Sequence, residues 1–249
     1  MSKSYQQFLK EKSGKTAVYT FGRFNPPTIG HEKLLRVVQT TSSNEGGDYF
    51  IYTSHSQDSK KNPLTHKQTI HFLKLIFPKY RPYIEDSLAK TALDAASEIH
   101  DKGGYTKLMM VVGSDRVRDF SSLLNRYNDK KSKHGYYNFD SIEVISAGER
   151  DPDAEGADGM SASKMRQAVV DGDYDSFKMG VPAGTSDSIC KNLYGAVAKG
   201  LQLKLKEDLG LDDLDELLNP AQLRKLSLRM KVQAKKPGFI KKRQIAMKK

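Results

Sequence analysis

The sequence predicts an α/β protein with a Rossmann-like, doubly wound parallel sheet. Three observations support this fold class. Short segments rich in Val, Ile, Tyr or Phe alternate with longer segments whose apolar residues have helical spacing. A turn rich in Gly and Pro, residues 22–30, follows the first strand-like segment. Signals for a helix start stand soon after several of these segments, as in units where a helix crosses between two parallel strands.

The predicted elements alternate along the chain. Each expected strand is short and rich in Val, Ile, Tyr or Phe, and the strands are placed at 16–21, 48–53, 81–85, 107–112 and 141–147. The expected helices are at 31–39, 65–77, 89–101, 115–127, 161–171, 173–179 and 186–205. The second helix starts with Thr65 as N-cap and stops before Pro78. The third has an apolar stripe at helical spacing, formed by Leu88, Ala92, Ala95, Ala96 and Ile99.

The composition is that of a soluble globular chain. With 249 residues, of which 37% are hydrophobic and 29% charged, the chain can bury a full core. No apolar run approaches the length of a membrane span, and the first residues lack the apolar segment of a secretory signal. The single cysteine, Cys190, excludes an intrachain disulfide and favours a reducing compartment. We therefore expect a cytoplasmic protein without a membrane span.

The net charge of +11 is concentrated at one end of the chain. Eleven of the 41 basic residues lie in 217–249, which has no acidic residue, and the other 30 balance the 30 acidic residues. We expect a domain at 1–205 and an acidic-then-basic helical extension at 206–249. The basic segment could bind nucleic acid, an acidic protein partner or an anionic membrane surface, or could be a solvated extension. Pairing with the acidic residues of a neighbouring copy would give a homo-oligomer.

The turn at 22–31 carries the groups best suited to chemistry. Its sequence, Gly-Arg-Phe-Asn-Pro-Pro-Thr-Ile-Gly-His, leads from a strand into a helix. Free N–H groups and the helix dipole favour phosphate at such a point. The turn offers a guanidinium (Arg23), a hydroxyl (Thr28), a bare backbone (Gly30) and an imidazole (His31). These groups suit a polyphosphate that is both held and reacted.

A second candidate phosphate site opens the late helix at 161–171. Ser161 is a candidate N-cap, and the free N–H groups of a helix start attract anions. Lys164 and Arg166 add positive charge within the first two turns. Alone, this pattern is a weak capping motif. Combined with the turn at 22–31, it favours one phosphate site made by two distant segments.

Two shorter segments are expected at the same edge of the sheet. Gly113 permits a tight turn after the strand at 107–112, and Ser114 or Asp115 can cap the next helix. Residues 62–65, Asn-Pro-Leu-Thr, come before the helix at 65–77. The first segment is as often a plain helix cap as a site, and the second is more often only a turn.

Several other kinds of site are excluded. The sequence has no P-loop, no G-x-G-x-x-G dinucleotide motif and no nucleophile elbow. Five further histidines show no metal-ligand spacing with cysteine, namely His55, His66, His71, His100 and His134. No protein-held metal site is therefore expected.

The motifs resemble those of the nucleotidylyltransferase superfamily. Residues 22–31 are similar to its (H/T)xGH signature, with Thr28 in the variant first position. Residues 160–166 resemble its I-S-S-T-x-x-R element, with Met, Ala and Ser in place of Ile, Ser and Thr. Residues 62–65 and 113–115 resemble elements of the nicotinamide-mononucleotide adenylyltransferase branch. The resemblance covers residues 15–182 and implies the nucleotidylyltransferase type of the Rossmann-like fold.

The resemblance also implies an activity and a set of site residues. A phosphate of the acceptor would attack the α-phosphorus of ATP, and pyrophosphate would leave without a covalent enzyme intermediate. Mg²⁺ is expected with ATP, held mainly by phosphate and water. The implied catalytic residues are His31, Thr28, Arg166 and Arg23. The implied ATP and phosphate ligands are Gly22, Phe24, Asn25, Gly30, Ser161, Ser163 and Lys164. The implied acceptor ligands are Asn62, Thr65, Gly113 and Asp115.

The acceptor expected from the resemblance is nicotinamide mononucleotide, which would give NAD. Two alternatives keep the same chemistry, with another phosphorylated acceptor such as a sugar or pantetheine phosphate, or with CTP as the donor. A third alternative is a non-catalytic nucleotide-fold module, whose basic segment 217–249 would bind nucleic acid or an assembly partner.

Overall fold

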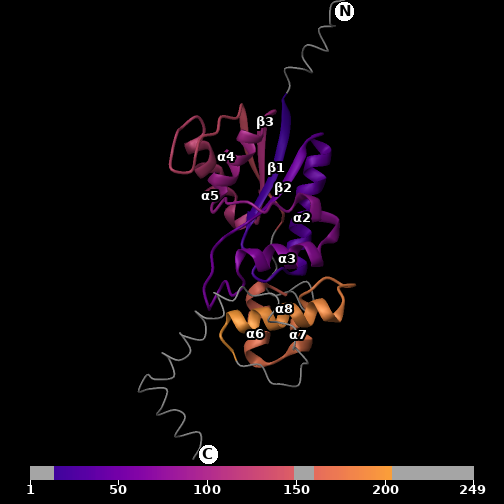
Figure 1. Cartoon of the computed structure of the whole chain (residues 1–249). Helices are drawn as coiled ribbons and strands as arrows, with labels where there is room; N and C mark the ends of the chain where they lie inside the picture. Colours follow the sequence, from indigo (N-terminus) through magenta and orange to yellow (C-terminus); the bar gives the residue numbers. More distant parts are fainter. Residues whose placement is uncertain (1–13, 149–159, 204–249) are drawn as a thin grey trace, which may run out of the picture. The chain divides into compact units, whose positions relative to one another are not determined.

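The computed structural model describes residues 14–148 and 160–203, which form a four-stranded sheet covered by helices (Figure 1). The strands are β1 (Lys15–Gly22), β2 (Asp48–Thr53), β3 (Tyr105–Val112) and β4 (Ser141–Ser146), in the order β2-β1-β3-β4. All three strand pairings are parallel. The predicted α/β fold class is therefore confirmed.

The helices cover both faces of this sheet. Figure 1 shows α2 on one side of the strands and α4 and α5 on the other, as doubly wound folds require. Two 3-10 turns are present, η1 (Pro78–Tyr83) and η2 (Ser114–Arg116). The α-helices are α2 (Ile29–Asn44), α3 (His66–Ile76), α4 (Ala92–Lys102), α5 (Val117–Tyr127), α6 (Ala162–Asp171), α7 (Tyr174–Met179) and α8 (Asp187–Gly200). Every predicted helix is found, although α2 is longer and α8 shorter than expected.

The predicted strand at 81–85 is wrong. The turn η1 occupies most of this segment, and only Ile84 joins the sheet, through a single parallel bridge to Ile51. Pro82 lies inside η1 and has no N–H to donate to a strand ladder, so a regular strand does not form. With this bridge counted, the order across the sheet is Ile84, β2, β1, β3, β4. From β1 the chain first adds β2 and Ile84 on one side, and then crosses to the other side of β1 to add β3 and β4, so the strand order reverses between β1 and β3. Ligands of such sheets bind at the carboxyl ends of the strands beside this reversal.

The core between the sheet and α4 follows from alternating strand side chains. Tyr19, Leu108 and Met110 face this side and are fully buried. The helix contributes four buried residues of the predicted stripe, Ala92, Ala95, Ala96 and Ile99. Leu88 does not belong to the stripe, because the helix begins only after its N-cap Thr91, and Leu88 is left 87% exposed.

The late helices adjoin the first turn of the sheet. The backbone N–H of Ile29, at the start of α2, donates to the carbonyl of Gly180 directly after α7 over 2.9 Å. The end of α8 packs against the β2–α3 connection so closely that a Cβ on Gly200 would lie 2.2 Å from the carbonyl oxygen of Pro63. The hydrogen bond from Ile29 to Gly180 therefore places the end of α7 at the β1–α2 turn.

Two sequence predictions concern residues outside those described. They are the extension at 206–249 and its basic segment 217–249. Among the helices that the structure describes, none is both long and apolar enough to cross a bilayer.

Candidate functional site

The β1–α2 turn holds His31 through a capping box in which histidine takes the place of the usual glutamate. Thr28 is the N-cap of α2, and its backbone N–H donates to Nδ1 of His31 over 3.0 Å. The Thr28 hydroxyl oxygen lies 3.0 Å from the same nitrogen. Because Nδ1 accepts, the proton of a neutral His31 imidazole is on Nε2. The turn therefore presents His31 as a hydrogen-bond donor at Nε2.

The ring of Phe24 helps to orient His31. The two ring centroids are 4.8 Å apart, and Phe24 is 99% buried with a positive φ of 45°. Gly22 is required by this arrangement, since a Cβ at residue 22 would come within 2.8 Å of the Phe24 ring. Gly22 and Phe24 were both predicted as phosphate ligands. In the structure they pack inside the turn and determine its conformation.

The backbone at Gly30 is open to a ligand. Of the first N–H groups of α2, that of Ile29 donates to Gly180 and that of His31 to the Thr28 carbonyl. Within residues 14–148 and 160–203, the N–H of Gly30 has no acceptor. A Cβ on Gly30 would come no closer than 3.6 Å to another atom, so the packing of the protein does not require glycine here. The missing side chain leaves space over an unpaired N–H at a helix N-terminus, which is an arrangement that suits an anion.

Arg166 joins the late helix to this turn. Its Nη1 donates to the carbonyl of Asn25 over 2.8 Å, although the two residues are 141 positions apart. Its Nη2 donates to the Ser163 hydroxyl over 2.9 Å. The two segments that the sequence analysis combined into one site are therefore in direct contact.

Two guanidinium groups approach each other at this contact. Burial lowers the pKa of Arg166, the positive charge of Arg23 lowers it further, and Asp58 opposes both. A guanidinium whose pKa is lowered still carries its charge at neutral pH. Neighbouring positive charges raise the electrostatic energy of the free protein, and a bound anion would relieve that repulsion.

The start of α6 is built as predicted. Ser161 is its N-cap, and the Ser161 hydroxyl accepts from the N–H of Lys164 over 3.2 Å. Ser161, Ser163 and Lys164 are all exposed, so they lie at the surface beside the Arg166 guanidinium. This predicted cap is confirmed.

Several predicted ligands have their side chains occupied by the protein itself. Asn25 is buried, and its amide both donates to and accepts from the backbone of Leu64, each over 2.9 Å. Asn62 donates to the Asp58 carboxylate. Thr65 caps α3, with its hydroxyl accepting from the N–H of Gln68 over 3.2 Å. Asn25 therefore holds the β2–α3 connection against the β1–α2 turn, whereas Asn62 and Thr65 stabilise the connection itself and the start of α3.

The carboxyl end of β3 differs from its prediction. Gly113 has an ordinary φ of −63°, so the turn does not depend on the conformational freedom of glycine. Ser114 and Asp115 lie inside η2, and α5 has no side-chain cap, which corrects the prediction that one of them caps the helix. Both side chains are exposed at the sheet edge where ligands bind in this type of fold.

A pair of histidines that sequence reasoning set aside lies near this edge. The rings of His55 and His66 are stacked, with centroids 3.6 Å apart and planes 20° apart. Nε2 of His55 lies 2.9 Å from the carbonyl of Ser87, and Nδ1 of His66 lies 2.9 Å from the Thr53 hydroxyl. The sequence signal for this pair is a histidine two residues after a buried strand, a position that metal-ligand spacing does not identify.

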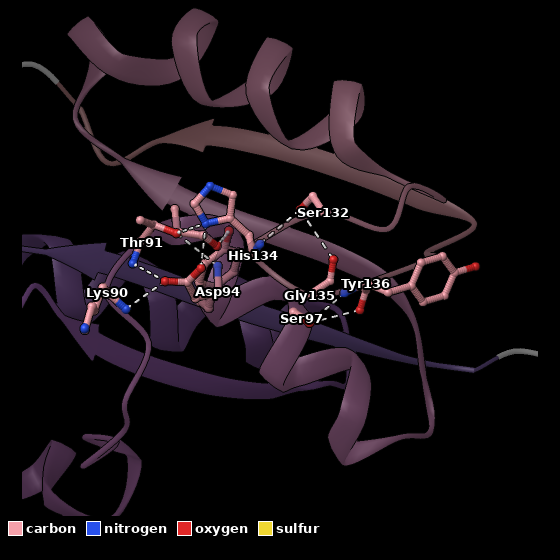
Figure 2. Close-up of polar contacts among 10 residues, drawn as sticks. Lys90, Thr91, Asp94, Ser97, Ser132, His134, Gly135 and Tyr136 are labelled. Atoms are coloured by element: carbon pink, nitrogen blue, oxygen red, sulfur yellow. Dashed lines mark hydrogen bonds and ion pairs between the residues drawn. The ribbon is translucent and has the colours of Figure 1, made fainter.

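A hydrogen-bond network around His134 has a structural role (Figure 2). The Asp94 carboxylate accepts from the N–H groups of Lys90 and Thr91 at the start of α4 and lies 2.7 Å from Nδ1 of His134. Ser97 bonds to the backbone of Tyr136 on the same loop. This network holds the loop before β4 against α4. The Asp94 carboxylate and the Ser97 hydroxyl are engaged in it, which indicates a structural role.

One comparison with known proteins agrees with this geometry. A family model described as cytidylyltransferase-like matches residues 19–168, which is more than half of the chain and includes the second half of β1, the first turn and most of α6. No curated protein matches the chain.

Proposed function

The chain belongs to the cytidylyltransferase-like family, within the nucleotidylyltransferase superfamily, and we propose that it transfers AMP from ATP to a phosphate-bearing acceptor with release of pyrophosphate. Nucleotidyl transfer is the reaction class that the family supports. The acceptor that we propose is nicotinamide mononucleotide, and the product is then NAD.

The contact between Arg166 and the Asn25 carbonyl carries this proposal. It unites an unpaired helix N–H at Gly30, a histidine donor at His31 and two neighbouring guanidinium groups. A triphosphate needs donors and positive charge along its whole length. These two segments, which are far apart in the sequence, supply both.

The proposed reaction needs positioning and charge stabilisation more than it needs a nucleophile from the protein. An oxygen of the acceptor phosphate attacks the α-phosphorus, the bond from that phosphorus to the bridging oxygen breaks, and pyrophosphate takes the electron pair. His31, with its proton on Nε2, and the Gly30 N–H donate to oxygens that gain negative charge. Arg23 and Arg166 neutralise the departing pyrophosphate. Preorganised donors of this kind often make the largest single contribution to such reactions.

Mg²⁺ is part of the proposal as the companion of ATP. Among the described residues, no three or more His, Cys, Asp or Glu side chains gather where they could hold a metal ion. Mg²⁺ on a nucleoside triphosphate is usually held by phosphate oxygens and water, so the residues present fit this mode. The ion would neutralise part of the triphosphate charge, while Arg23 and Arg166 bind the rest.

The direct test is pyrophosphate release from the full chain with ATP, Mg²⁺ and nicotinamide mononucleotide, with NAD identified as the product. Parallel reactions replace ATP by CTP, or the acceptor by sugar and pantetheine phosphates. We expect release with ATP and the mononucleotide. Release only with another donor or acceptor would move the proposal to that substrate. No release from any pair would contradict catalysis and favour the binding-module alternative.

A further inference from the structure

The stacked histidines stand beside the proposed phosphate site. Thr53, which contacts His66, lies opposite Gly22 in the strand register, and the N–H of Ser54 donates to the Gly22 carbonyl over 2.8 Å. His66 comes two residues after Leu64, whose backbone Asn25 holds. The pair is therefore fixed to the same turn that presents His31.

The stack has an inner ring and an outer ring. The His66 side chain is 14% exposed, and its Nε2 is buried without a hydrogen-bond partner among the described residues. His55 is partly exposed and directs its Nε2 to the Ser87 carbonyl. That carbonyl accepts, so Nε2 of His55 carries the proton. Hydrogen bonds at both rings thus lock the orientation of the stack.

The inner ring of the stack is disfavoured as a cation. Burial lowers the pKa of His66, and the neighbouring His55 lowers it further, while Asp86 opposes both. Two protonated rings at a centroid distance of 3.6 Å would also repel each other. His66 is the first residue of α3, where the helix dipole disfavours a positive charge.

A carboxylate lies beside the inner ring. Asp86 Oδ1 lies 3.8 Å from Nε2 of His66, and the Asp86 side chain is 72% exposed. The adjoining Leu88 is 87% exposed. The segment that carries Asp86 and Leu88 is held in place because the Ser87 hydroxyl donates to Glu98 and accepts from the N–H of Ala89. A stacked aromatic face thus lies beside a segment that carries an exposed carboxylate and an exposed leucine.

We propose that His55, backed by His66, and the carboxylate of Asp86 bind a planar heteroaromatic ring of the acceptor, and that they favour a cationic ring. This inference rests on the proposed function and specifies its acceptor. Aromatic rings stack on one another, and a cationic ring gains further from a π face and a nearby carboxylate. An acceptor with an anionic ring would be repelled by Asp86, and one without a ring would leave the stack uncovered.

The test compares two Michaelis constants in the full chain, one for ATP and one for nicotinamide mononucleotide, whose pyridinium ring is cationic. The loss of one stacked ring in His55→Ala should raise the KM of the mononucleotide about tenfold and leave that of ATP unchanged. His55→Phe keeps a ring but removes the bond to Ser87, and it should stay within about twofold of the wild type. The matched control is His71→Ala, an exposed histidine of α3 that contacts Phe72.

Asp86→Asn tests the preference for charge. Nicotinic acid mononucleotide has a ring carboxylate in place of the carboxamide, so the wild type should prefer the nicotinamide form. Asp86→Asn should reduce this preference, measured as a ratio of kcat/KM, by about three- to tenfold, since the exposed carboxylate is partly screened. Thermal unfolding of each variant serves to identify loss of fold.

The outcomes separate this inference from the proposed function. An active wild type in which His55→Ala leaves the acceptor KM unchanged, or raises the KM values of ATP and acceptor equally, overturns the ring site alone. His55→Phe behaving like His55→Ala also overturns it, because the Ser87 bond would then be the feature that matters. A wild type that releases no pyrophosphate with any acceptor overturns the proposed function and this inference with it.

Discussion

The β1–α2 turn and the β2–α3 connection lie at the same edge of the sheet, and both carry residues predicted to bind substrates. In the first, the Gly30 N–H has no acceptor among the described residues, and Arg23 approaches Arg166. In the second, Asn62 binds Asp58 and Thr65 caps α3. Polar groups that have no hydrogen-bond partner within the fold indicate a ligand site, whereas groups whose hydrogen bonds are made within the fold indicate a structural role.

The largest effect is expected from His31→Ala, which removes the donor at Nε2 from the first region. We expect kcat/KM for pyrophosphate release to fall by about 10²–10³-fold, because one preorganised donor to a developing charge is lost. Thermal unfolding should show that the fold persists. Activity within a factor of two of the wild type would remove His31 from the site.

A smaller effect on activity is expected from Gly30→Ala. This substitution tests whether the space above Gly30 is needed by a bound ligand or by the packing of the protein itself. A Cβ at this position meets nothing closer than 3.6 Å, so stability should be unchanged. Activity should fall about ten- to hundredfold, because a methyl group displaces the bound phosphate. The matched control is Gly22→Ala, whose Cβ would meet Phe24 at 2.8 Å and should lower the melting temperature. Full activity of Gly30→Ala would contradict a phosphate over this N–H.

Thr65→Ala sharpens the comparison from the second region. It removes the hydroxyl that caps α3 and should lower stability by about 1 kcal/mol, or about 2–4 °C in melting temperature. The acceptor KM should change less than about twofold, since the hydroxyl is used by the helix. A large rise in acceptor KM at unchanged stability would return Thr65 to the list of ligands.

The smallest effect concerns the pH dependence of stability. The pKa of His66 is lowered in the folded chain, chiefly by burial, whereas the unfolded chain has an ordinary imidazole. As pH falls from about 7 to about 5, the unfolded state takes up a proton that the folded state resists, so stability decreases. Urea unfolding at several pH values should show a shallower decrease for His66→Gln. Thr65→Ala removes no titratable group and should leave the slope unchanged; equal slopes for all three proteins would contradict this assignment.

Much of the fold could be predicted because apolar periodicity and caps are local signals. Thr65, Ser161 and Pro78 set helix ends that the structure reproduces, and the superfamily predicted from the (H/T)xGH-like turn is confirmed. The predicted strand at 81–85 is wrong because Tyr83 and Ile84 are typical strand residues, while Pro82 prevents the ladder. Leu88 failed because its spacing fits a helix that begins only after Thr91.

The candidate site could be predicted less completely, because pairing in space decides which polar residues remain available. Sequence alone could not show that Asn25 holds the backbone of Leu64, or that the Arg166 guanidinium reaches the Asn25 carbonyl. The stack of His55 on His66 depends on the path of the chain after β2 and on Ser87. Contacts of this kind carry no periodic pattern.

The central claim is that the β1–α2 turn and the start of α6 grip one triphosphate, and a double-mutant cycle on ATP binding tests it most directly. Calorimetry would give the dissociation constant of Mg·ATP for the wild type, Arg23→Ala, Arg166→Ala and the double variant. Because binding relieves repulsion between the two arginines, the double variant should lose less binding free energy than the sum of the single losses, by more than about 0.5 kcal/mol. Losses that add to within about 0.3 kcal/mol would mean that the two arginines act independently, and they would contradict a shared triphosphate.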